Sequence, residues 1–140
     1  MKGGTNMKKI RMLALLLLAA VLLTACGGGN VRHVKREMGE SALYSQGEIR
    51  AAMNEVVGFF RKEFDGCTLT GLEYDEGRMG ERQQMEAEEL GREVIILLAE
   101  FRVDGSGGDG SLNPNSTYRN YQFTLTRTLL GWEIRDWGYG

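Results

Sequence analysis

The chain has 140 residues, of which 42% are hydrophobic, and this length gives room for one folded domain. Its formal net charge is −2, but four of its 17 basic residues and none of its 19 acidic residues lie in positions 1–25, so residues 26–140 carry a net charge of −6. An acidic body of this kind argues against nucleic acid as a partner.

The N-terminus has the pattern of a secretory signal peptide. Lys8, Lys9 and Arg11 precede the apolar run MLALLLLAAVLL, and small residues follow it. The run is shorter than the roughly 20 residues that a membrane-spanning helix needs, so we expect residues 1–25 to be a signal peptide that is removed. Residues 1–6, MKGGTN, precede the basic residues with which a signal peptide normally begins. The codons for Lys-Gly-Gly can form a ribosome-binding sequence at a usable distance before Met7. We therefore expect Met7 to be the true start.

A cysteine follows this segment directly. Leu23, Thr24, Ala25 and Cys26 resemble the lipobox of bacterial lipoproteins, a Leu-Ala/Ser/Thr-Gly/Ala-Cys pattern at the end of the apolar region. In that class the cysteine thiol receives a diacylglyceryl group and becomes the first residue of the mature chain. The resemblance implies that lipid on Cys26 anchors the protein to the outer face of the cell membrane. Cys67 then has no mate, so we expect no disulfide within the chain.

Residues 26–43 precede the first clear helix signal. They read CGGGNVRHVKREMGESAL and have almost no apolar periodicity, which predicts a flexible tether. As a coil this segment would hold the domain on the order of 20 to 25 Å from the lipid. Arg32, Lys35 and Arg36 lie near its membrane end, where an anionic leaflet attracts basic residues. A merely solvated linker is the equally simple alternative.

Residues 44–140 are expected to form a single domain that begins with a long helix. Ser45 and Glu48 have the spacing of a capping box, and Tyr44 with Ile49 has that of a hydrophobic staple. Apolar residues then recur at three- and four-residue steps, which predicts an amphipathic helix. They are Ile49, Ala52, Met53, Val56, Val57, Phe60 and Phe64.

A strand and a second helix are predicted next. CTLTGLEY alternates apolar and polar residues and changes parity at Gly71, which indicates a strand with a β-bulge. The stretch 80–90 is dense in charged and amide side chains, and this composition favours a short solvated helix that Gly91 closes.

Two further strand patterns complete the domain. EVIILLAEFRV is apolar on both faces in its first half, so we expect that half to be covered on both sides. YRNYQFTLTRT alternates more cleanly, which predicts one buried and one wet face. A turn near Gly131 leads into WEIRDWGYG, and a hairpin is the natural pairing of the last two strands.

This order of elements predicts an α+β fold in which the long helix packs on a curved antiparallel sheet and a short second helix is added. The arrangement resembles the cystatin or NTF2-like layout in outline, although no motif carries that likeness. In FDGCTLTG, DGSLNPNSTY and DWGY the chain also resembles small, functionally unassigned lipoproteins of Gram-positive bacteria. That second resemblance implies placement and fold, and it implies no activity.

The residues that carry enzyme chemistry are sparse. His33 is the only histidine and lies in the predicted tether, which removes the usual Ser-His-Asp and Cys-His arrangements. Cys67 fits a small buried strand residue better than a nucleophile. We therefore expect a non-enzymatic binding module without a cofactor, whose partner is an envelope protein or a cell-wall component. A small carboxylate-dependent enzyme of the envelope is the alternative.

The C-terminal aromatic residues are the first candidate binding site. Trp137, Tyr139 and Tyr118 predict an exposed patch suited to stacking on a sugar ring or to anchoring a partner. Aromatic residues at the end of a sheet more often close the core, so that interpretation stands beside the first.

The glycine-rich segment DGSGGDGSLNPNST is the second candidate. Asp104, Asp109 and Asn113 offer oxygen ligands of the kind that calcium prefers. The spacing departs from the EF-hand pattern, with Gly108 at the fifth position and no glutamate at the twelfth. A metal-free connection between two strands is therefore the preferred interpretation, and a calcium-responsive surface domain is the alternative.

Overall fold

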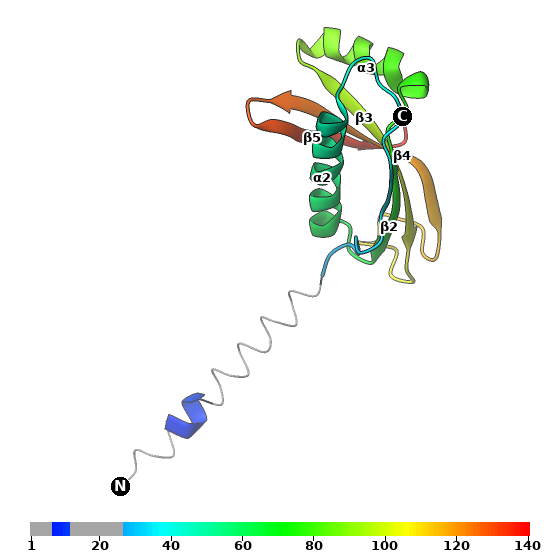
Figure 1. Ribbon diagram of the computed structural model, residues 1–140. Coiled ribbons are helices and arrows are strands. Elements are labelled where there is room, and N and C mark those ends of the chain that lie inside the picture. Colours follow the sequence, from blue (N-terminus) through cyan, green and yellow to red (C-terminus); the bar gives the residue numbers. More distant parts are fainter. Residues whose placement is uncertain (1–6, 12–26) are drawn as a thin grey trace.

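The computed structural model describes residues 7–11 and 27–140 (Figure 1). Cys26 and most of the expected signal peptide lie outside these ranges, and residues 7–11 are helical. Within the described ranges, none of the helices combines the length and the apolar character needed to cross a bilayer.

A five-stranded mixed sheet forms the centre of the domain, in the order β1-β2-β3-β4-β5. The strand bounds are β1 (Lys35–Glu37), β2 (Cys67–Glu73), β3 (Val94–Val103), β4 (Thr117–Thr128) and β5 (Gly131–Gly138). β1 pairs in parallel with β2, and the other neighbours are antiparallel. The predicted α+β class is confirmed. A purely antiparallel sheet is not what the structure shows, because a segment expected to be a tether supplies the parallel edge strand.

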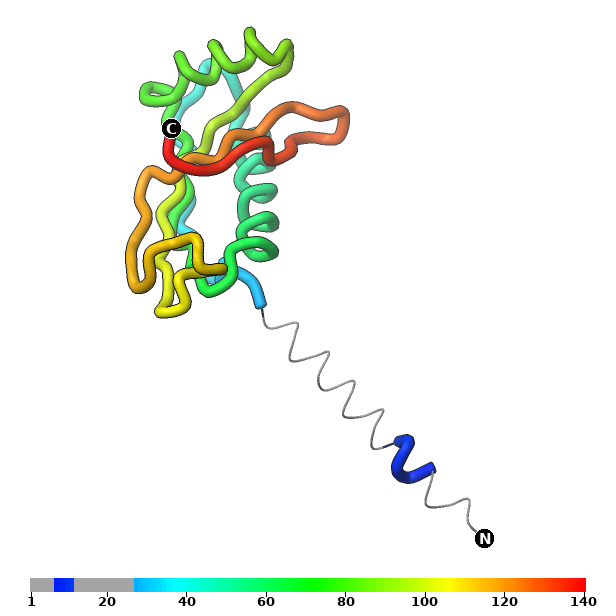
Figure 2. The backbone as a smooth tube through the Cα atoms, turned by 180° about the vertical axis from the view of Figure 1, so that it is seen from behind, coloured from blue at the N-terminus to red at the C-terminus, as the bar shows by residue number. Residues whose placement is uncertain are grey.

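Helix α2 (Gln46–Glu63) lies across one face of the sheet (Figures 1 and 2). The predicted capping box is present: the Ser45 hydroxyl accepts from the Glu48 N–H, and the Glu48 carboxylate accepts from the Ser45 N–H. The apolar stripe of α2 packs on the inward residues of β2 to β5 and forms the main core. Its fully buried members are Ile49, Ala52, Met53, Val56 and Phe60.

Helix α3 (Glu76–Leu90) covers the other face of the sheet over the first half of β3. Asp75 caps it, because its side chain accepts from the Arg78 N–H, and Gly91 ends it in a left-handed conformation. The helix therefore begins at Glu76 rather than at the predicted position 80. A second apolar cluster lies beneath it, built from Met79, Ala87, Leu90, Val94, Ile96 and Leu98. This cluster confirms that the start of β3 is covered on both sides.

The segment before α2 is packed along the domain, so the tether predicted for residues 26–43 is wrong from Gly28 onward. The Gly29 N–H donates to the Arg61 carbonyl oxygen at 2.9 Å, and the Asn30 N–H donates to the Cys67 carbonyl oxygen at 2.8 Å. Gly28 has a φ of 127°, and a Cβ on it would lie 2.3 Å from the Arg61 carbonyl oxygen. These glycines permit a close approach of two backbone segments, and they do not make this part of the chain a flexible tether.

Two strand details were predicted correctly and one was not. The ladder between β2 and β3 shifts register between Leu69 and Gly71, which is the predicted bulge, and β4 and β5 form the predicted hairpin. The expectation of a wet polar face on β4 is wrong at Thr124 and Thr126, which are only 6% and 3% exposed. They pair with Ile96 and Val94, so they share the face that α3 covers.

Candidate functional site: an aromatic pocket beside the glycine-rich loop

A pocket of about 180 Å³ lies between the C-terminal end of α2, the glycine-rich loop and the end of β5. Figure 2 shows the yellow loop reaching toward the lower end of α2. The apolar lining consists of Phe64, Cys67, Leu112, Tyr121 and Trp137. The polar part of the rim consists of Glu63, Asp65, Asp109 and Ser111. The site thus combines aromatic walls with three carboxylates.

Trp137 is placed at this pocket by the hairpin register. It pairs with Phe123 across the β4–β5 ladder, and its ring lies 4.8 Å from that of Phe59 on α2, centroid to centroid. The contact with Phe59 holds the indole against the helix, while 47% of the residue stays exposed. Trp137 is therefore supported by α2 and still about half exposed.

The other two predicted aromatic residues form a separate stack. Tyr118 lies 5.0 Å from Phe101 and 6.0 Å from Tyr139 between ring centroids. Tyr121, which is buried, lies 5.5 Å from Tyr139 on one side and lines the pocket of Trp137 on the other. Both interpretations of the aromatic residues therefore apply in part: Tyr118 helps to close the core, whereas Trp137 and Tyr139 remain exposed.

The electrostatic environment of the pocket is negative. Burial, followed by the charges of Asp104, Asp109 and Asp65, raises the pKa of the Cys67 thiol to about 11. At neutral pH this thiol is protonated and is a poor nucleophile. No ion pair of the described residues involves Glu63, Asp65 or Asp109. The last carbonyl groups of α2 add partial negative charge at the same place, so the rim favours a cation.

The carboxylates of the glycine-rich loop are engaged by neighbouring serines. Asp104 accepts from the Ser106 hydroxyl and N–H, and Asp109 accepts from the Ser111 hydroxyl and N–H. These bonds, the hydroxyl bonds first, lower the pKa of both aspartates. Asn113 donates its backbone N–H to the Tyr118 hydroxyl at 3.1 Å. In residues 7–11 and 27–140, no group of three or more His, Cys, Asp or Glu side chains is placed to hold a metal ion.

A larger groove of about 350 Å³ crosses the outer face of β1 to β4. Its charges are paired with one another: Lys35 lies 2.6 Å from Glu37, and Arg119 lies 3.5 Å from Glu100. We favour the smaller pocket as the binding site, because its carboxylates lack such partners and its walls are aromatic. Sequence reasoning did not find this groove, since it placed Lys35 and Glu37 in a tether.

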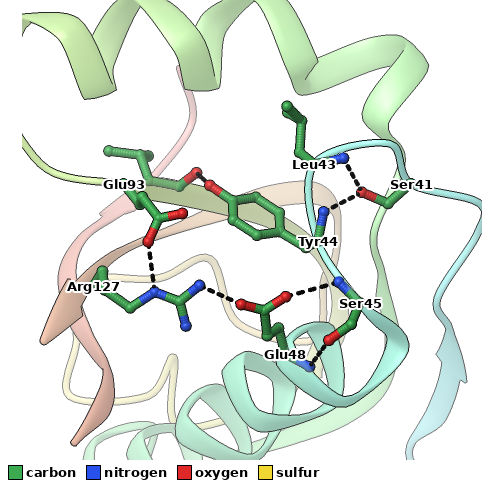
Figure 3. A network of polar contacts seen from close by, with 8 residues as sticks. Ser41, Leu43, Tyr44, Ser45, Glu48, Glu93 and Arg127 are labelled. Carbon is green, nitrogen blue, oxygen red and sulfur yellow. Dashed lines mark hydrogen bonds and ion pairs between the residues drawn. The ribbon is translucent and has the colours of Figure 1, made fainter. Parts of the chain in front are cut away.

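A polar network ties the start of α2 to the sheet at the opposite end (Figure 3). Arg127 donates to Glu48 at 2.5 Å and to Glu93 at 2.8 Å, and its guanidinium lies 4.1 Å from the centre of the Trp132 ring. Hydrogen bonds from the Ser45 backbone and from Arg127 lower the pKa of Glu48. The network fixes the N-terminal turn of α2, and we assign it a structural role.

The free edge of β3 is closed in the same region. The β2–β3 ladder ends at Leu98, which leaves backbone groups earlier in β3 without a strand partner. The Tyr44 hydroxyl donates to the Val94 carbonyl oxygen at 2.7 Å, and the Ile96 N–H donates to the Gln83 side-chain oxygen at 2.8 Å. Burial is the main reason that the pKa of Tyr44 is raised to about 12. These side chains satisfy backbone groups that a strand would otherwise pair.

Comparison with known proteins returns no match, neither to a protein-family model, nor to a curated protein, nor to a solved structure. Sequence reasoning found Trp137 and Asp109 separately and did not place them at one pocket. It also missed Phe64, Tyr121 and Asp65 as lining residues, because their meeting depends on strand register and on the path of the loop.

Proposed function

We propose that this chain is a membrane-anchored extracytoplasmic lipoprotein whose domain is a non-enzymatic binding module. The lipobox pattern that ends at Cys26 supports an anchor on the outer face of the cell membrane. The aromatic pocket supports binding, and it is the observation that carries the proposal. The position of α2 across one face of the sheet supports the cystatin or NTF2-like layout as the finer description of the fold.

The chemistry of the pocket selects the kind of ligand. An exposed indole offers a flat face for a sugar ring or an apolar stem, and it also attracts cations through its ring quadrupole. The carboxylates of Glu63, Asp65 and Asp109 lie on the rim. We therefore propose a cell-wall component, or a basic side chain of an envelope protein, that presents a protonated amine.

The test of binding uses two sugars that differ in one group. Calorimetric titration with glucosamine oligosaccharides and with their N-acetylated counterparts should show binding of the amine form alone. Trp137→Ala should weaken that binding at least tenfold, since a central aromatic contact contributes about 2 kcal/mol or more. Leu130→Ala, at a fully exposed turn position, is the control and should bind as the unmodified protein does. Equal affinity for both sugars, or no loss in Trp137→Ala, would contradict the proposed ligand.

The test of the anchor is separate. Radiolabelled palmitate should enter the unmodified protein, and it should not enter Cys26→Ser, which should keep its signal peptide or appear in the medium. Equal labelling of the two would remove the lipoprotein assignment.

A further inference from the structure

The chain that joins Cys26 to the folded domain is very short. Gly27 is the one residue between Cys26 and Gly28, and Gly28 already lies against the last turn of α2. A Cβ on Gly29 would lie 2.5 Å from the Phe60 carbonyl oxygen and 2.7 Å from the Phe60 ring. Each extended residue spans at most about 3.6 Å, so two residues reach about 7 Å from this point.

The attachment point lies at one end of the domain. Gly29 is bonded to Arg61 at the C-terminal turn of α2, and Asn30 bridges to Thr68 at the start of β2. Figure 1 shows the chain entering the domain at this end, with α3 at the other. Helix α2 has 18 residues and therefore separates the two ends by about 27 Å. The aromatic pocket lies at the same end as the attachment point, because residues 63–65 line it.

Basic side chains surround the attachment point. Arg32, Arg61 and Lys62 are exposed, and none of the ion pairs of the described residues includes them. Lys35 and Arg36, which were expected beside Arg32 near the membrane, lie in β1, and their side chains are paired with Glu37 and Asn54. The carboxylates of the pocket rim lie at this end of the domain too. The basic side chains alone therefore do not hold the domain at an anionic membrane, and the lipid on Cys26 supplies the attachment.

We propose that the domain rests directly on the anionic headgroup layer, with the C-terminal turn of α2 and the residues Arg32, Arg61 and Lys62 as its contact surface. This proposal rests on the lipid anchor at Cys26 proposed above. A free coil of residues 26–43 would hold the domain on the order of 20 Å from the lipid. The packed segment instead brings the domain into contact with the headgroups. The aromatic pocket then takes ligands from the layer next to the membrane.

The experiment compares a probe at each end of the domain. Lipidated full-length protein carries a fluorophore on Lys62→Cys or on Glu88→Cys, each combined with Cys67→Ala so that a single thiol reacts. The proteins are reconstituted in phosphatidylglycerol vesicles that contain a headgroup-linked quencher. The Lys62 probe should be quenched severalfold more strongly than the Glu88 probe on α3. Equal quenching of the two would overturn the proposal.

A linker variant gives the matched control. Eight Gly and Ser residues inserted between Gly27 and Gly28 keep every contact within the domain and free it from the membrane, so they should abolish the difference between the probes. A difference that persists unchanged would also contradict the proposal, since the short connection would not be its cause.

Failure of the anchor and failure of the contact are distinguishable. Absence of palmitate would remove both proposals, whereas a lipidated protein with equally quenched probes would remove the contact alone. Amide hydrogen exchange on the full chain tests the fixed segment without any lipid: the Gly29 and Asn30 amides should exchange slowly. Rapid exchange at both positions would show that the segment is a tether after all.

Discussion

Two glycine-rich segments of this protein, residues 27–29 and 105–110, have similar composition and different structural roles. In the first, Gly28 and Gly29 bring the chain against the carbonyl groups of a helix that is distant in sequence. In the second, Gly107 packs on Leu112 within its own loop, and Gly110 has open space around it. Glycine permits both arrangements for the same steric reason, so composition alone does not tell a tether from a tightly packed backbone.

The largest difference should appear in the side chains beneath the two segments. Phe60, below Gly29, is fully buried, and Phe60→Ala should cost roughly 3 to 5 kcal/mol of unfolding free energy. Leu112, below the glycines of the loop, is only partly buried, and Leu112→Ala should cost about 1 to 2 kcal/mol. Urea denaturation of both variants measures this contrast. Equal losses would mean that the loop is as much a part of the core as the first segment.

The next largest effect is expected at Gly28. Its φ of 127° lies in a region that other residues rarely adopt, and an added Cβ would meet the Arg61 carbonyl oxygen at 2.3 Å. Gly28→Ala should therefore cost about 2 to 4 kcal/mol, since backbone strain and overpacking both contribute. Thermal melts measure this loss of stability. If Gly28→Ala loses less stability than an ordinary surface substitution does, residues 27–29 detach easily from α2.

Gly110→Ala is the matched change in the loop. Gly110 has a φ of 95° but no heavy atom within 4 Å of an added Cβ. Only the backbone penalty remains, so the expected cost is about 1 kcal/mol. A cost as large as that of Gly28→Ala would show that the added methyl group meets other atoms and that the space around Gly110 is not open.

The features that sequence reasoning predicted correctly depend on neighbours in the chain. The capping box at Ser45, the bulge at Gly71 and the doubly apolar start of β3 each require only residues a few positions apart. The local pattern of hydrophobicity and capping contains that information.

The features that sequence reasoning missed depend on pairing across the chain. β1 is a strand because β2 offers a parallel edge to it, and its own residues are all exposed and polar. Thr124 is buried because α3 covers the partner strand, which no pattern within β4 reports. The aromatic pocket likewise requires residues from α2, β4, β5 and the loop to meet. Tertiary contacts override the local pattern in each of these cases.

A smaller effect concerns the serines that close the loop. Hydrogen bonds from Ser106 and Ser111 lower the pKa of Asp104 and Asp109 in the folded protein. A lowered folded pKa gives stability that is present above the unfolded pKa and is lost as the pH falls through the folded pKa. The double variant Ser106→Ala with Ser111→Ala should therefore be slightly less stable at neutral pH, and the difference should shrink in acid. Urea midpoints across this range measure it, and a difference that grows in acid would contradict the assignment.

The smallest expected effect is that of calcium. A site in the loop would stabilise the fold by about 2.7 kcal/mol when calcium is present at a hundredfold excess over its Kd. The described residues bring no group of three or more His, Cys, Asp or Glu side chains together, whereas calcium takes six to eight oxygen ligands. We expect the melting temperature in millimolar calcium to match that in chelator to within about a degree or two. A rise of several degrees that disappears in Asp109→Ala would show that calcium orders this loop.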